Sequence, residues 1–187
     1  MKRIRIFAAL IMLFAFTASV NAQLTLDKDQ LKTAKKMASK NEKDGWKVKP
    51  GGLPLIEQEK MSMSYQLDRA NWQVGSASSV GTVYDAALIS ALALAKANLA
   101  SNIQTQLSSK FSIDAGNQQI GTDEAKSKAE AAMKSQAITV NQTLANPDII
   151  YEAYQMRPNG SVEVSVRIAI QKQKVDNLVN SIFDQTK

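Results

Sequence analysis

The chain has 187 residues, with 23 Lys and Arg against 17 Asp and Glu, a formal net charge of +6, and neither cysteine nor histidine. Without cysteine there is no disulfide, no lipid-anchoring cysteine, no thiol nucleophile and no thiolate metal site, and without histidine the commonest general base and metal ligand are missing. Three of the basic residues lie among the first five, so the chain after residue 22 carries 20 basic and 17 acidic residues. That balance gives little reason to expect a nucleic-acid partner.

The first 22 residues follow the order of a secretory signal peptide: a basic start, an apolar run and a small-x-small end. The apolar run, residues 6–20, has about fifteen residues, whereas a membrane-spanning helix needs roughly 20. We therefore predict cleavage after Ala22 and export to the periplasm, the outer membrane or the medium, with no transmembrane segment in the mature chain. A retained N-terminal membrane anchor is the alternative. The rest divides into an N-terminal helix with an extended connector, residues 23–56, and a single α+β domain, residues 57–187.

The first predicted element is a helix over residues 27–44. Leu31, Ala34 and Ala38 recur at helical spacing, which makes a thin apolar stripe and predicts a peripheral helix. Lysines crowd its remaining faces, and we interpret them first as a solubilising surface and second as a contact for acidic lipid or polysaccharide. These lysines are Lys32, Lys35, Lys36, Lys40 and Lys43.

The next stretch, residues 45–58, contains prolines and glycines that exclude a regular element, so an extended connector is predicted. Its apolar side chains, Trp46 and Leu55 among them, are expected to hold it against the body. A short helix is predicted over residues 56–67 and a strand over residues 72–78. Small residues stand on both faces of that strand, which is typical of close approach by a neighbour.

A long helix is predicted after this strand, with Thr82 and Asp85 as its capping pair. Apolar residues form one stripe and polar residues the opposite row, which disfavours a membrane span and predicts a soluble helix lying flat on a sheet. Ala86, Ala93 and Ala97 stand outside the stripe and could take a second neighbour. The stripe consists of Tyr84, Leu88, Ala91, Leu92, Ala95, Leu99, Ile103 and Leu107, and the polar row of Ser90, Asn98, Ser101, Gln104, Thr105 and Ser108.

A second long helix is predicted over residues 123–145, where an Asn-Pro pair stops it. Two strands, residues 149–157 and 161–170, flank a Pro-Asn-Gly turn, which is the clearest hairpin signal in the chain. A last helix begins at about residue 172.

Along the second hairpin strand, valine and isoleucine alternate with Glu163, Ser165 and Arg167, which predicts one buried face and one wet face of the sheet. The order of elements predicts an α+β fold. We expect a small antiparallel sheet of about three strands, two long helices packed on one of its faces, and peripheral N- and C-terminal helices.

Three motifs follow one another along the chain: a W-x-x-G-x-A strand, an alanine-rich helix and a hairpin with a valine-rich second strand. They are carried by Trp72, Gly75 and Ala77, by Ala87, Ala91, Ala95, Leu99 and Ala100, and by residues 154–170. In these motifs the chain resembles the LPP-twenty-like envelope lipoprotein family, and its connector, residues 45–55, resembles that of exported Bacteroidetes-type proteins. The resemblance implies an α+β envelope domain and supplies no catalytic residue. The chain differs from the lipoprotein members because no cysteine follows its signal peptide.

Carboxylates are the catalytic groups that this composition leaves open, because two of them can work as acid and base in a glycoside hydrolase. Trp46 and Trp72 could stack on sugar rings, although anchoring the core or the connector is the simpler role. No phosphate-binding loop, dinucleotide fingerprint or serine elbow is present, so we predict no catalytic residue, no cofactor and no metal. The candidate carboxylates are Asp114, Asp123, Glu124, Asp148, Glu152 and Glu163.

The sequence therefore predicts a non-enzymatic, exported cell-envelope protein that binds or assembles with an envelope protein or polymer. Two alternatives stay open. One is a carboxylate-dependent hydrolase of envelope polymers. The other is a self-assembling structural protein that forms a homo-oligomer through the alanine face of the long helix.

Overall fold

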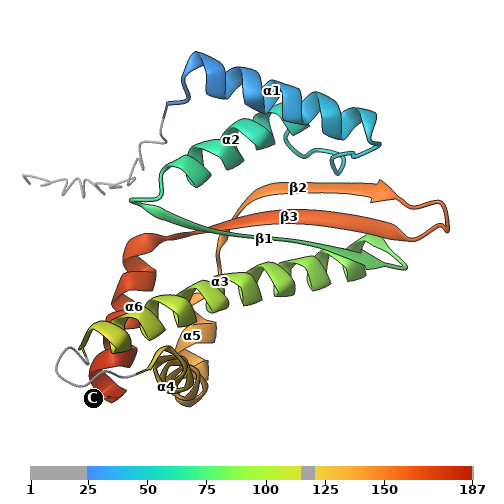
Figure 1. The fold of residues 1–187 in the computed structure, drawn as a ribbon. Helices are drawn as coiled ribbons and strands as arrows, with labels where there is room; N and C mark the ends of the chain where they lie inside the picture. The colour runs from blue at the N-terminus through green and yellow to red at the C-terminus, as the bar shows by residue number, and fades with distance from the viewer. Residues whose placement is uncertain (1–24, 115–120, 187) are drawn as a thin grey trace, which may run out of the picture.

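The computed structural model describes residues 25–114 and 121–186, and the predicted signal peptide, residues 1–22, lies outside them. Figure 1 shows a layered molecule in which the sheet lies between the α1–α2 pair and α3, and the predicted α+β fold is confirmed. The elements are α1 (Lys28–Lys43), α2 (Leu55–Leu67), β1 (Trp72–Gly81), α3 (Tyr84–Asp114), α4 (Thr122–Ser135), α5 (Ala137–Thr143), β2 (Asp148–Met156), β3 (Val162–Gln171) and α6 (Lys172–Thr186).

The three strands form one antiparallel sheet in the order β1-β3-β2, so that β3 is central. Its valine and isoleucine residues suit a strand that is paired on both sides. In the turn between β2 and β3, the Arg157 amide donates to the Ser161 carbonyl at 2.8 Å. Gly160 in this turn has a φ of +80°, which glycine adopts without steric cost. The predicted hairpin is thus confirmed.

The connector covers the outer edge of β2. Lys47 and Tyr154 exchange two backbone hydrogen bonds of 2.7 and 2.9 Å. On the same strand, the backbone N–H of Glu152 donates to the side-chain carbonyl of Gln58 at 2.6 Å. The opposite edge strand, β1, pairs with no further strand among the described residues. The two edges of the sheet are therefore different: the connector pairs with β2, whereas β1 receives, within the described part of the chain, a single side-chain hydrogen bond, from Asn98 of α3 to the Ser76 carbonyl at 2.7 Å.

α3 lies along β1 and β3, as predicted for the long helix (Figure 1). Gly75 of β1 lets it come close, because a Cβ at this position would lie 2.5 Å from the Ala95 carbonyl oxygen and 2.8 Å from Leu99 Cγ. The small residues of this strand are thus used for close approach. The fully buried stripe of α3 consists of Ala87, Ala91, Ala95, Leu99, Ile103 and Leu107.

The second predicted long helix is divided in two. α4 and α5 meet at Gln136, whose φ of −107° and ψ of 21° interrupt the helix. β-branched residues follow at once, in residues 138–140, and such residues are weak helix formers. The bend lets α4 pack against α3 while Val140 and Leu144 enter the same core. The prediction of one unbroken helix over residues 123–145 is therefore wrong.

The α1–α2 pair covers the face of the sheet that was predicted to be wet (Figure 1). The side chains of Glu163 and Arg167 on this face are only 14% and 18% exposed. The prediction is wrong because the covering helix has a mainly polar buried side, which leaves no hydrophobic pattern in the sequence. The buried residues of α2 are Leu55, Gln58, Glu59, Ser62 and Ser64.

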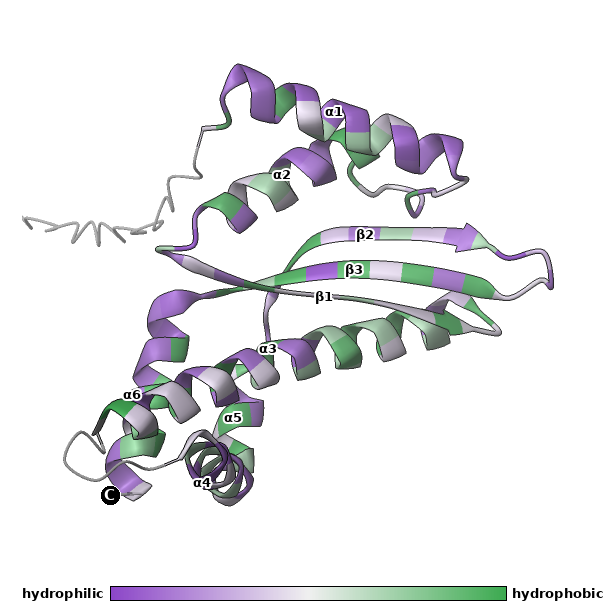
Figure 2. Ribbon diagram, in the orientation of Figure 1, coloured by the Kyte–Doolittle hydropathy of each residue, from purple (hydrophilic) through white to green (hydrophobic). Residues whose placement is uncertain are grey.

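Hydropathy separates the two outer layers. Figure 2 shows α1 as hydrophilic along most of its length and the first half of α3 as largely hydrophobic. The main core lies between the sheet and α3 and continues to α4, α5 and α6, while smaller clusters lie under α1 and α2. Among the described residues, α3 is the helix long and apolar enough, by length and composition alone, to cross a membrane. In this fold it lies against β1 and β3.

Candidate functional site

An ion pair lies in the layer between α2 and the sheet. Glu59 of α2 is 1% exposed, and Arg167 of β3 approaches it with Nη1 at 2.6 Å from Oε2 and Nη2 at 3.2 Å from Oε1. The same Nη1 donates to the Ser62 hydroxyl at 3.0 Å. The planar guanidinium matches the two carboxylate oxygens. Because both charges are largely removed from water, each depends on the other.

Asn41 of α1 and Tyr151 of β2 complete the cluster. The Asn41 side-chain N–H group donates to Glu59 Oε1 at 2.9 Å and to the Tyr151 hydroxyl at 3.1 Å. The Arg167 guanidinium carbon lies 4.1 Å from the centre of the Tyr151 ring, a cation–π contact. Burial, and then the negative charge of Glu59, raise the pKa of Tyr151 to about 12. We call Asn41, Glu59, Ser62, Tyr151 and Arg167 the polar cluster.

The polar cluster joins α1, α2, β2 and β3 through side chains that satisfy one another. Such a network fixes the position of elements, and it leaves no polar group directed at a substrate. Sequence reasoning missed it, because Arg167 was assigned to a wet face and Glu59 was not singled out. The available signal was weak: Glu59 and Ser62 lie one helical turn apart on the same side as Leu55.

The candidate carboxylates predicted from the sequence are dispersed over the molecule. Asp123 and Glu124 are exposed on α4 and pair with Lys126 and Lys128 at 3.7 and 3.5 Å. Asp148 is exposed at the start of β2. All three are ordinary surface groups.

Two further candidates are at the ends of elements. Asp114 is the last residue of α3, and its side chain lies outside the described part of the chain. Glu163, near the start of β3, pairs with Arg157 at 2.7 Å and accepts a hydrogen bond from the Gln155 amide at 2.6 Å. The charge of Glu163 is therefore balanced by Arg157 within the hairpin.

Glu152 has the most developed surroundings of the six. The Tyr84 hydroxyl, at the start of α3, donates a hydrogen bond to Glu152 Oε1. The Tyr84 ring meets the Tyr154 ring edge to face, with 5.4 Å between ring centres, and Lys49 Nζ lies 5.3 Å from the centre of the Tyr84 ring. Burial, and next the hydrogen bond to Glu152, raise the pKa of Tyr84. Glu152 is thus held as an acceptor for a neutral phenol.

Glu152 and Glu163 cannot act as a pair. In the β2–β3 ladder, Glu152 lies opposite Val166. Val166 belongs to the core beneath α3, whereas Glu163, three positions away, faces α2, because side chains alternate along a strand. Two carboxylates on opposite faces of a sheet cannot flank one glycosidic bond. The described residues also contain no group of three or more Asp or Glu that could hold a metal ion.

The two tryptophans act as anchors. Trp72 is buried, and its ring centre lies 4.5 Å from that of Tyr65. Trp46 is partly buried and packs with Val48 and Ile56 in the small cluster beneath the connector. Trp72 and Tyr65 also contribute to the lining of a hollow beside β1.

A hollow of about 590 Å³ lies where β1 meets the end of α2, the middle of α3 and the start of α6. Its lining includes Arg69, Asn102 and Lys172, and it contains no carboxylate. Gln73, also in the lining, has a buried Oε1 without a hydrogen-bond partner among the described residues. The hollow offers polar contacts and no acid–base pair.

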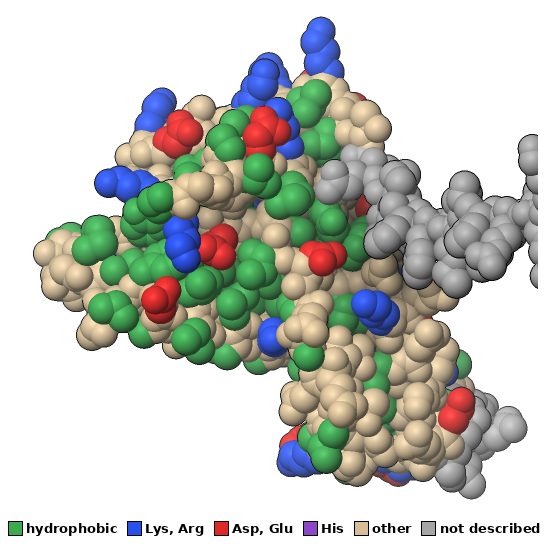
Figure 3. Space-filling view, turned by 180° about the vertical axis from the view of Figure 1, so that it is seen from behind, with side chains coloured by type: hydrophobic (Ala, Val, Ile, Leu, Met, Phe, Trp, Pro, Cys, Tyr) green, Lys and Arg blue, Asp and Glu red, His purple; other side chains and the backbone are tan. Residues whose placement is uncertain are grey.

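The side of α3 that points away from the sheet is exposed and, after Asp85 in the first turn, carries no charged residue from Ala86 to Ala95. Val83 and Ile89 are 57% and 69% exposed, and the small residues Ala86, Ala93 and Ala97 lie open as the sequence predicted. Figure 3 shows hydrophobic side chains gathered over the region of α3 and β2, seen from behind. We call the following exposed set, in which Val83 directly precedes the helix, the outer face of α3: Val83, Ala86, Ile89, Ser90, Ala93, Leu94 and Ala97.

The resemblance to LPP-twenty-like envelope proteins stays a prediction from motifs in the sequence. Its W-x-x-G-x-A strand and its alanine-rich helix lie in contact, as β1 and α3. Comparison of the chain with models of known protein families, with curated proteins and with solved structures finds no match in any of the three.

Proposed function

We propose that this chain is an exported cell-envelope protein that acts by binding or assembling with another protein, and not by catalysis. The outer face of α3 is the observation that carries this proposal. A helix that covers a sheet normally turns polar and charged residues to solvent. Here the outward side has Ile89 and Leu94 exposed and, beyond Asp85 in the first turn, no charged residue from Ala86 to Ala95. Contiguous apolar surface of this kind marks interaction sites.

The shape of this surface suits a helix from the partner. Ala86, Ala93 and Ala97 are short, so a second helix can come close to the α3 backbone, since the distance between packed helices is set by the side chains at the contact. Ile89 and Leu94 stand beside this row as larger apolar contacts. A second copy of α3 offers the same relief, so a homo-oligomer is the second candidate form of this function.

Other features support binding over catalysis. The described candidate carboxylates are paired with lysine or arginine, exposed singly, or held by a tyrosine. Export and the envelope location are supported by the signal-peptide pattern of residues 1–22 and by the motif resemblance. The absence of cysteine means that noncovalent contacts alone stabilise the fold after export.

The test uses the mature chain, residues 23–187, with Ile89 and Leu94 both replaced by serine. The matched control replaces Ile113 and Ile138 by serine; they are 79% and 75% exposed, against 69% for Ile89 and 49% for Leu94, and lie elsewhere on the surface. Light scattering measures self-association, and affinity capture from envelope extracts measures binding to other proteins. We expect the Ile89→Ser, Leu94→Ser variant to lose the association and the control to keep it.

Two results would replace this proposal. The first is turnover of peptidoglycan or another glycan by the purified chain, abolished by Glu152→Gln, which would establish the hydrolase. The second is association that the Ile89 and Leu94 substitutions leave unchanged, which would move the binding function to another surface. A strict monomer over a wide concentration range would exclude only the homo-oligomeric form of the proposal and not binding to another protein.

A further inference from the structure

The six lysines of α1 all point to the same side of the helix. At 100° per residue they fall within an arc of about 140°, and all six are exposed. Ala34 and Ala38, on the opposite side, are buried. The lysines that crowd around the thin apolar stripe in the sequence thus form one basic face, and the structure leaves all of it exposed. This lysine face consists of Lys28, Lys32, Lys35, Lys36, Lys40 and Lys43.

The six lysines of the lysine face outnumber the acidic residues beside them on α1. None of the six forms a salt bridge within the described part of the chain. The carboxylate of Asp27 is occupied with two backbone N–H groups of the N-terminal cap. Asp29 lies inside the arc and Glu42 about 20° outside it, which leaves an excess of four lysines. On α4, by contrast, Lys126, Lys128 and Lys134 each pair with an acidic residue one turn away.

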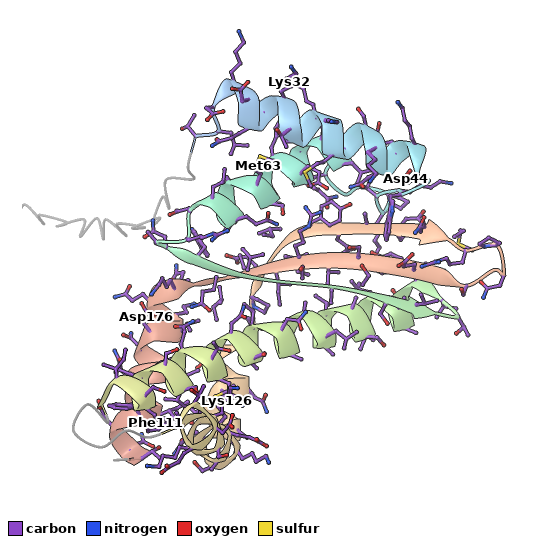
Figure 4. All side chains as sticks on the ribbon, viewed as in Figure 1. Lys32, Asp44, Met63, Phe111, Lys126 and Asp176 are labelled. Carbon is purple, nitrogen blue, oxygen red and sulfur yellow. The ribbon has the colours of Figure 1, made fainter. Side chains whose placement is uncertain are left out.

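The lysine face is a convex ridge on the outside of the molecule. α1 forms the outermost layer above the sheet, and its 16 residues span about 24 Å (Figure 1). Figure 4 shows Lys32 directed away from the body and Lys126 at the opposite end of the molecule. A ridge can place several ammonium groups on a flat array of anions at once, whereas a charged polymer strand is usually held in a groove.

We propose that the lysine face docks this protein on a bilayer surface rich in anionic lipid, with the lysine ammonium groups against headgroup phosphates. Each lysine near such a surface strengthens binding roughly fivefold, and several act together. With α1 on the bilayer, the outer face of α3 lies beyond the sheet and points away from the lipid (Figure 1). The docking therefore neither needs nor blocks the protein contact proposed above.

Vesicle flotation of the mature chain, residues 23–187, tests this docking. One set of vesicles is phosphatidylcholine alone, and the other contains phosphatidylglycerol as well. The test variant is Lys32→Gln, Lys36→Gln, Lys40→Gln, and the matched control is Lys126→Gln, Lys128→Gln, Lys134→Gln, which removes the same charge from α4. Glutamine keeps the helix propensity near that of lysine, and thermal unfolding checks that both variants are folded.

We expect binding to the anionic vesicles only, lost at high salt because ions screen exposed charges. The α1 variant should bind about 100-fold more weakly, from three lysines at roughly fivefold each, while the control should bind within about threefold of the wild type. An equal loss of vesicle binding in both variants would show that binding depends on net charge and not on the lysine face, and would overturn the proposal. Equal binding to neutral vesicles would also overturn it, as would tighter binding to a soluble acidic polysaccharide that the α1 variant loses.

Discussion

The two faces of the sheet are covered in different ways, although β3 supplies alternate residues to both. The side toward α3 is held by apolar area removed from water, an effect that has no direction. The side toward α2 carries Glu163, Ser165 and Arg167. Here the directed contacts of Arg167 with Glu59 and Ser62 add to two small apolar clusters. The residues of β3 that face α3 are Val162, Val164, Val166, Ile168 and Ile170.

Apolar burial and directed polar contacts respond differently to substitution. A face held by apolar burial loses stability when a substitution leaves a cavity or inserts extra side-chain volume, and the loss grows with that volume. A face held by an ion pair loses little when both partners become apolar, but much when one is removed and the other stays buried. The polar cluster and Gly75 are therefore the positions at which the comparison can be tested.

The largest effect is expected for Glu59→Ala. It leaves the Arg167 charge in a site with little water, and the free energy of unfolding should fall by about 3–5 kcal/mol in urea denaturation. The double variant Glu59→Leu, Arg167→Met removes both charges and should recover most of this loss. A cost below about 1 kcal/mol for the single change, as for an exposed salt bridge, would remove the contrast between the faces.

Gly75→Ala tests the apolar face. The added methyl group meets a backbone carbonyl of α3 that cannot turn away, so we expect a loss of about 2 kcal/mol, within the usual range for overpacking. Gly121→Ala is the matched control, because no atom lies within 4 Å of the added group. Its effect should stay within about 0.5 kcal/mol. Similar melting temperatures for the two variants would show that β1 and α3 are not in tight contact.

What the sequence could predict differs between the faces for a related reason. The alternation along β3 and the stripe of α3 are apolar patterns, and both predicted elements and their buried sides were confirmed. The buried side of α2 has helical spacing too, but it uses Gln58, Glu59 and Ser62. Hydrophobic periodicity cannot detect a buried polar side, so neither the cover over this face nor the polar cluster could be predicted.

Tyr151 gives the α2 side a pH dependence that the valines and isoleucines of β3 lack. Tyrosine in the unfolded chain has a pKa of about 10, and in the folded protein burial raises the pKa of Tyr151 to about 12. The folded state thus keeps a proton that the unfolded state loses. This contribution to stability is fully present below pH 10 and is lost as the pH rises through 12.

The measurement compares urea denaturation of the wild type and Tyr151→Phe at neutral and alkaline pH. Phenylalanine has no proton to lose, so the variant should show a smaller alkaline fall, by roughly 1–2 kcal/mol. The sign follows from the raised folded pKa. Identical alkaline profiles for the two proteins would mean that the Tyr151 hydroxyl is as open to water in the folded state as in the unfolded chain.

The smallest effect on stability is expected at the outer face of α3. Ile89→Ser changes an exposed side chain and should alter the free energy of unfolding by less than about 0.5 kcal/mol. The same change should weaken association in light scattering or capture experiments. A large loss of stability in the isolated, monomeric chain would show instead that Ile89 packs within the fold.

The covered edge of β2 limits how copies of this protein can join through their backbones. Lys47 and Gln58 occupy hydrogen-bonding positions at which a foreign strand would otherwise add. Growth of a cross-β fibre requires each unit to accept a neighbour on both sides. Among the described strands, β1 is the edge that pairs with no further strand, so strand addition there would join two copies as a closed pair and would not continue into a fibre.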